Sequence, residues 1–293
     1  MNEFFQQWIG TALELPQMQR AFWIALMAGP AAGLLGTFIT ARGMAFFSDA
    51  IAHGAMTGVA FGLLFQVSDT IYGPGMQLVL VIFCCVLALL MAFLLERTSL
   101  RADTIIAFTF TGSVALGVVI IEKLPGYRLL EGALFGDILA TTPTDLIIIG
   151  GLCALIAGFI IWNARALTLM VVHEGLARIE HTRTRLLHYA FVLLVAVSIA
   201  LLLKQLGALL ISGLIVIPAA SARVIAPGFR SMLAISGGLG LAGSTSGVIG
   251  SYHWDTSTGP TIVLCNVALL IVSMIGMTFW NLVRRKSSKR QLG

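Results

Sequence analysis

Residues 77–95 read QLVLVIFCCVLALLMAFLL, a run of nineteen residues without a charged side chain. A helix of this length matches the roughly 30 Å thickness of the hydrocarbon core of a bilayer. Hydrophobic residues make up 58% of the 293-residue chain and charged residues 11%, whereas soluble domains carry about a quarter charged residues. The run is continuous rather than alternating, and only helices and closed barrels satisfy backbone hydrogen bonds in lipid. The chain is therefore predicted to be an all-α polytopic membrane protein.

Apolar runs of about 17 to 24 residues recur along the whole chain. Segment 125–143 fits a short or re-entrant helix, and Lys204-Gln205 leaves a very tight turn, so eight and ten spans stay open beside nine. We expect one bundle of about 8–9 transmembrane helices over residues 21–283, after an N-terminal extension (1–20) and before a basic tail (284–293). The predicted spans are 21–41, 47–66, 77–95, 103–122, 144–164, 187–203, 207–226, 231–250 and 260–283.

The basic residues orient this bundle. With the N-terminus outside, fourteen Lys and Arg residues fall on the cytoplasmic side and four outside, which is the asymmetry that the positive-inside rule describes. The loop 165–186 is then cytoplasmic and the loop 251–259 lies outside. The cytoplasmic set is Arg42, Arg97, Arg101, Arg165, Arg178, Arg183, Arg185, Arg223, Arg230, Arg284, Arg285, Lys286, Lys289 and Arg290; the outer set is Arg20, Lys123, Arg128 and Lys204.

Glycines recur at four-residue spacing in three of the runs. Small residues on one helix face let neighbouring backbones approach closely in a membrane. A tightly packed bundle is therefore expected, with close contacts at Gly29 and Gly33, at Gly54, Gly58 and Gly62, and at Gly243 and Gly247.

Two polar residues inside the second run are candidates for chemistry. Asp49 and His53 are four residues apart, so both point the same way on a helix. Carboxylate oxygen and imidazole nitrogen are suitable ligands for zinc or manganese, and charged residues within spans are usually functional. An alternative is an Asp–His hydrogen bond that packs two helices together.

Further polar groups fall near the predicted outer side. Acidic groups around an outward vestibule would attract cations, although each residue taken singly is better explained as a solvated loop charge. The candidates for this outer vestibule are Glu122, Glu131, Asp137, His253 and Asp255.

The predicted cytoplasmic loop carries an amphipathic pattern. Val172, Leu176 and Ile179 share one helical face, which suits a helix that docks into a partner's groove or one that lies on the membrane surface. His173-Glu174 lacks the second histidine of a zinc-protease motif, and the chain has no Gly-x-x-x-x-Gly-Lys-Ser/Thr phosphate loop. We therefore expect a transport subunit rather than an enzyme, and any ATPase would be a separate chain.

Taken together, these stretches resemble the permease subunits of metal-type ABC importers, the bacterial zinc and manganese uptake systems. The match extends over about residues 21–280, through the order and spacing of four motifs. They are Arg42 to His53 followed by Gly58, Leu134 to Leu139, Gly207 to Leu210 running on through Ile217 to Arg223, and Asp255 to Pro260.

The resemblance implies a homodimer in the bacterial inner membrane, two cytoplasmic ATP-binding subunits, and a periplasmic or lipid-anchored metal-binding protein. Asp49 and His53 match a D-x-x-x-H pair that lines the ion path. Asp255 matches an acidic residue at the outer end of the last span, where a loop-capping role is equally plausible. The loop 171–185 matches the helix that couples to the ATPase, with Glu174, Gly175, Leu176, Ala177, Ile179 and His181 as its contact residues.

The resemblance also favours zinc as the transported ion, through the stretches Leu134 to Asp145 and Gly259 to Cys265. No permanently bound cofactor is expected, and ATP would bind the partner. Manganese or iron stays open because Asp and His bind these ions too. A proton-coupled secondary transporter is the main rival. An intramembrane protease lacks a convincing catalytic set, and a scaffold would not account for the Asp49/His53 pair.

Overall fold

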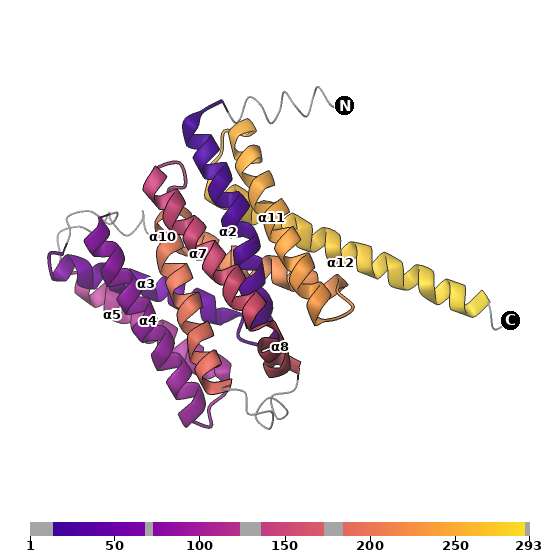
Figure 1. Ribbon diagram of the computed structural model, residues 1–293, viewed down its shortest axis with the longest axis horizontal. Helices are drawn as coiled ribbons and strands as arrows, with labels where there is room; N and C mark the ends of the chain where they lie inside the picture. Colours follow the sequence, from indigo (N-terminus) through magenta and orange to yellow (C-terminus); the bar gives the residue numbers. More distant parts are fainter. Residues whose placement is uncertain (1–13, 68–72, 124–135, 173–183, 291–293) are drawn as a thin grey trace.

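The computed structural model describes residues 14–67, 73–123, 136–172 and 184–290, the last ten of these by backbone only. All regular secondary structure in these ranges is helical, which confirms the predicted fold class (Figure 1). The helices are α2 (Pro16–Ala41), α3 (Phe46–Leu64), α4 (Pro74–Arg97), α5 (Ala102–Ile121), α7 (Pro143–Trp162), α8 (Ala164–Val172), α10 (Thr184–Ile225), α11 (Phe229–His253) and α12 (Thr258–Arg290).

Eight of these described helices are long and apolar enough to cross a membrane. One of them, α10, is 42 residues long and contains a non-helical residue, Gly207, with φ 70° and ψ 164°. His188 contacts Arg42 and Arg223 contacts Thr40, both at the C-terminal end of α2, whereas the middle of α10 contacts the first turn of α7. The chain thus runs along the bundle and returns within α10. The tight turn predicted at Lys204-Gln205 lies next to this reversal, and the eight helices make nine passes.

The reversal gives the bundle two distinguishable ends. The Arg42 end carries Arg42, Arg97 and Arg185, where α2 and α4 finish and α3, α5 and α10 begin. The Lys204 end is opposite, where α4 and α7 begin and α10 turns back. The described basic residues are concentrated at the Arg42 end.

Helices α2 and α11 pack closely through small residues. A Cβ added at Gly29 would meet the Gly240 carbonyl, and one at Gly33 would meet the Ser236 carbonyl. The Ser236 hydroxyl donates to the Gly33 carbonyl at 2.7 Å, and Ser244 donates to a carbonyl of α2 at 2.8 Å. Such hydrogen bonds suit an apolar solvent because they leave no hydroxyl unpaired.

The other predicted glycine contacts are also confirmed. Each glycine face lies against a neighbouring helix at a distance that leaves little or no room for a side chain. Gly54 faces Leu87 and Ser113, Gly58 faces Leu80 and Phe83, Gly62 faces Met76, Gly243 faces Asn266, and Gly247 faces Ile262.

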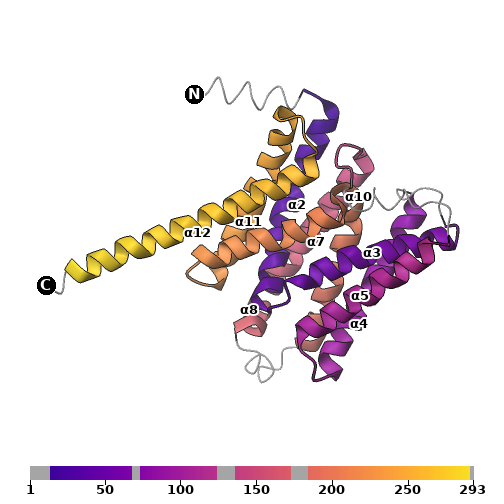
Figure 2. The same cartoon turned by 180° about the vertical axis from the view of Figure 1, so that it is seen from behind.

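The two ends of the chain differ from the predicted boundaries. Helix α2 begins at Pro16, inside the predicted extension, because proline suits the first turn of a helix. Helix α12 continues to Arg290, so the predicted tail is helical up to that residue, and it extends past the rest of the bundle (Figure 2). The exposed Ile275, Phe279 and Trp280 on α12 are apolar side chains of the kind that face lipid.

Candidate functional site

Helix α3 has one narrow open face. Most of its residues are buried against α4, α5 and α10, and Figure 2 shows α3 running beside α5. The residues that keep contact with solvent in its first three turns are Phe46, Asp49, His53 and Met56. Their spacing of three and four residues aligns them along one side of the helix. Asp49 and His53 therefore share an accessible stripe, as predicted.

The two side chains contact each other within the helix. His53 Nδ1 lies 3.3 Å from Asp49 Oδ1 and 3.1 Å from the Asp49 carbonyl oxygen. Both oxygens can only accept a hydrogen bond, so Nδ1 carries the proton. In the neutral imidazole the other ring nitrogen, Nε2, then has the lone pair, and this is the form in which imidazole binds metals. The contact lies inside one helix, so it does not pack two helices together.

Two neighbouring helices complete the surroundings. The Phe110 ring on α5 meets the His53 ring edge to face, with centroids 5.7 Å apart. The Ser212 hydroxyl, in the second half of α10, approaches the Asp49 carboxylate. Sequence reasoning missed both residues, since neither carries a charge and each lies far from α3 in the chain. The site thus joins α3, α5 and α10.

The exposure of Asp49 and His53 determines whether an ion can reach them. The His53 side chain is 20% exposed and that of Asp49 36%, so an ion could reach them in an isolated chain. Two ligands are fewer than the four that zinc prefers at a structural site. Within the described ranges no group of three or more His, Cys, Asp or Glu side chains could hold a metal ion. The pair on one chain is therefore a partial, open set of ligands.

The predicted vestibule residues occupy separate turns. Asp137 accepts hydrogen bonds from the amides of Leu139 and Ala140, so its carboxylate holds its own turn. Glu122 follows the last residue of α5, and His253 ends α11. Asp255 lies in the turn before α12 with φ 50°. Glu131 lies outside the described residues.

The predicted coupling residues, Glu174, Gly175, Leu176, Ala177, Ile179 and His181, also lie outside the described ranges. Helix α8 precedes that segment and the start of α10 follows it.

A partly buried ion pair lies at the Lys204 end. Lys204 Nζ binds both carboxylate oxygens of Asp145, at 2.8 and 2.9 Å, and the two side chains are 15% and 13% exposed. Asp145 also forms a capping box with Thr142 at the start of α7. Sequence reasoning placed Lys204 in an outer turn and did not identify its partner.

Comparisons with known proteins agree with this architecture. The chain is 32% identical, over 88% of its length and 95% of the relative's, to the high-affinity zinc uptake system membrane protein ZnuB of Haemophilus influenzae. It is 27% identical, over 98% of its length and 91% of the relative's, to the manganese transport system membrane protein MntB of a Synechocystis strain.

A solved structure and a family model complete the comparison. PsaBC from Streptococcus pneumoniae in complex with Fab superimposes with a TM-score of 0.77 at 26% identity, over 92% of this chain and 95% of the other. The model of the ABC 3 transport family matches residues 14–277. The helical bundle, its nine passes and these matches together show that the chain is a multi-pass membrane permease that belongs to the ABC 3 transport family.

Proposed function

We propose that this permease imports zinc ions, and that the ions pass Asp49 and His53 on α3. The observation that carries the proposal is the open stripe of α3, where a carboxylate and an imidazole lie in an otherwise uncharged span. Carboxylate and neutral imidazole are common zinc ligands. The 32% identity to a zinc uptake permease supports zinc as the cargo.

The incomplete ligand set favours a dimer. Two copies of the chain, arranged about a two-fold axis with α3 near that axis, would contribute two carboxylates and two imidazoles. Four such ligands match the coordination number of zinc. The exposure of Asp49 and His53 in a single chain is expected for residues that face such an axis.

The partners and the orientation follow the predicted scheme. The Arg42 end faces the cytoplasm because it carries most of the basic residues, and a separate ATP-binding subunit docks there against the loop 165–186. The Lys204 end faces a metal-binding protein outside the inner membrane, near the turn that holds His253 and Asp255. ATP binding and hydrolysis switch the pathway from outward to inward access, so each state has its own affinity for the ion.

Transport in liposomes tests this function. The chain is co-expressed with its proposed ATP-binding and metal-binding partners, and uptake of labelled zinc and manganese is measured with and without ATP. We expect ATP-dependent zinc uptake that excess manganese does not reduce. Uptake that ignores ATP and follows a proton gradient would instead establish a secondary transporter.

Manganese is the second candidate cargo. The manganese transport relative matches 98% of this chain, and Asp and His ligands bind both ions. ATP-dependent manganese uptake that zinc does not reduce would show that the transported ion is manganese rather than zinc. The proposed ATP-driven mechanism would remain unchanged.

A further inference from the structure

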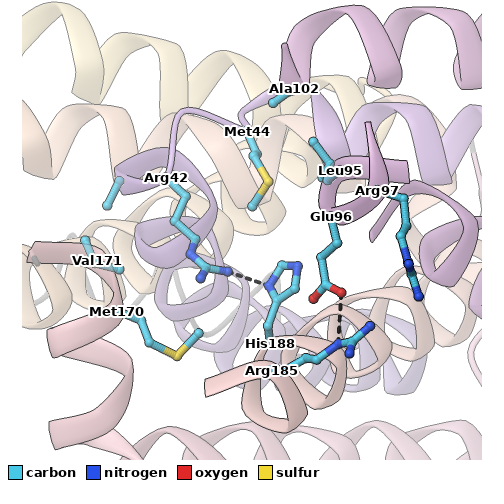
Figure 3. A pocket seen from close by; sticks show the side chains of 11 residues that line it. Arg42, Met44, Leu95, Glu96, Arg97, Ala102, Met170, Val171, Arg185 and His188 are labelled. Carbon is cyan, nitrogen blue, oxygen red and sulfur yellow. Dashed lines mark hydrogen bonds and ion pairs between the residues drawn. The ribbon is translucent and has the colours of Figure 1, made fainter. Parts of the chain in front are cut away.

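A cavity of about 930 Å³ opens at the Arg42 end of the bundle. Its walls come from the ends of α2, α4 and α8 and from the starts of α5 and α10 (Figure 3). Residues from opposite walls meet across it in two polar contacts. None of the residues in these contacts belongs to the predicted ion path, and among them only Arg185 falls within the predicted coupling loop, 165–186.

The first contact joins α10 to the turn between α2 and α3. Arg42 Nη1 lies 2.6 Å from Nδ1 of His188, and Figure 3 shows the two side chains pointing toward each other. Arginine can only donate, so Nδ1 of His188 accepts. The turn that follows Arg42 is short and ordered: Gly43 has φ 71°, and the Met44 amide bonds the Ile39 carbonyl at 3.1 Å.

The second contact joins α10 to the end of α4. Glu96 Oε2 accepts from Arg185 Nε at 3.0 Å and from the Tyr189 hydroxyl at 3.0 Å. Glu96 is the second-last residue of α4, and α5 begins at Ala102, also on the cavity wall. Arg185, His188 and Tyr189 all lie in the first two turns of α10.

The two contacts lie next to the starts of α3 and α5, the helices that hold His53 and Phe110. Beyond the Arg42 turn, α3 starts at Phe46, and His53 lies seven residues further, about 10 Å along the helix axis. Beyond the α4 end, α5 carries Phe110, whose ring packs on His53. Since α3 and α5 pack along each other, a displacement at the start of α10 would act on both.

The start of α10 is also where the predicted coupling loop, 165–186, rejoins the bundle. We propose that the Arg42–His188 contact, supported by the Glu96 contact, transmits movement of that loop to α3 and thereby sets the access of the ion to Asp49 and His53. This inference rests on the proposed ATP-driven function. It makes His188 and Arg42 positioning residues, which act on the ion only through α3.

Three variants test the link in the full reconstituted complex. His188→Ala removes the acceptor, whereas His188→Asn keeps an oxygen close to the position of Nδ1. Arg97→Ala is the matched control, since Arg97 lines the same cavity but its guanidinium lies over the Phe93 ring at 5.7 Å. Two quantities are measured for each: the ATP hydrolysed per zinc ion imported, and the effect of ATP on maleimide labelling of a cysteine at Phe46, which is 68% exposed.

We expect His188→Ala to raise the ATP consumed per zinc ion by about fivefold or more, in the range of typical coupling energies, while the complex still assembles and hydrolyses ATP. The ATP-dependent change in labelling at position 46 should vanish in this variant. Both readouts should return in His188→Asn and stay at wild-type values in Arg97→Ala.

The two readouts separate this inference from the proposed function. An unchanged ATP-to-zinc ratio in His188→Ala, with normal wild-type uptake, would overturn the link. So would wild-type labelling at position 46 that ignores ATP. Labelling that responds to ATP through His188 in a complex that imports no zinc would overturn zinc as the cargo and support the link.

Discussion

At the scale of the residue, Asp49 and His53 form one contact within a helical turn, and the proposed ion path depends on it. The Asp49 oxygens accept the proton on His53 Nδ1, so in the neutral imidazole the lone pair lies on Nε2, the nitrogen that is left to bind an ion. In the proposed path the second oxygen of the same carboxylate would bind the ion. The pair is therefore expected to act as a unit, and loss of either side chain should weaken the other as a ligand.

Replacing Asp49 by Asn tests this coupling. Even groups outside the first ligand shell alter metal affinity by about 10- to 100-fold, so we expect zinc uptake to fall by at least about tenfold while the assembled complex keeps its yield and thermal stability. Uptake and size-exclusion profiles of Asp49→Asn and Met56→Leu are compared, with Met56→Leu as the control on the same stripe. Wild-type uptake by a folded Asp49→Asn complex would remove Asp49 from the ion path.

The Lys204–Asp145 ion pair contributes to stability rather than to the ion path. Its two side chains are 15% and 13% exposed, so the roughly 3 to 5 kcal/mol lost when one partner of a fully buried pair is removed is an upper bound for this pair. Lys204→Met should therefore lower the melting temperature of the purified permease strongly, and Asp145→Asn added to it should recover part of the loss. Arg101→Gln is the control, since the Arg101–Asp103 pair spans 4.0 Å and is 88% and 65% exposed. Equal melting temperatures for Lys204→Met and Arg101→Gln would contradict this role.

At the scale of the element, α10 depends on one residue for its reversal. Gly207 has φ 70° and ψ 164°, a conformation that residues with a Cβ avoid. The backbone of residues 136 and 137 packs closely against this turn. The Asp137 amide donates to the Lys204 carbonyl at 3.1 Å, and Gly136 packs against Gly207. The direction of the second half of α10, and with it the position of Ser212, follows from this residue.

A Gly207→Ala substitution should destabilise the permease by about 1 to 3 kcal/mol, the usual cost of forcing a side chain into such a conformation. Gly213→Ala is the matched control on the same helix, because its Cβ would meet Val263 at an ordinary contact distance of 3.4 Å. Thermal unfolding of both variants in the same detergent measures the difference. A Gly213→Ala loss as large as that of Gly207→Ala would show that helix packing, not the backbone conformation, is responsible.

At the scale of the whole molecule, the nine passes place the turn between α4 and α5 and the turn between α11 and α12 on opposite sides of the membrane. Ser99 lies in the turn between α4 and α5 at the Arg42 end, and Ser257 lies in the turn before α12. Both are exposed. Single cysteines at these positions, labelled in intact cells with a membrane-impermeant maleimide, should report position 257 as external and position 99 as internal. Labelling of both from one side would contradict the nine-pass topology.

Hydropathy and charge in the sequence determined the membrane class, the span positions and the glycine-lined faces, because lipid imposes those demands on every helix separately. The periodicity of α3 likewise placed Asp49 and His53 on one side of a helix. The tertiary structure alone decided which helix meets which. Arg42 and His188 are 146 residues apart, and Lys204 and Asp145 are 59 apart. All apolar helix faces are equally soluble in lipid. The sequence of one helix therefore indicates which of its sides is buried, but not which neighbouring helix packs on that side. Only packing brought Phe110 and Ser212 to the Asp49–His53 pair.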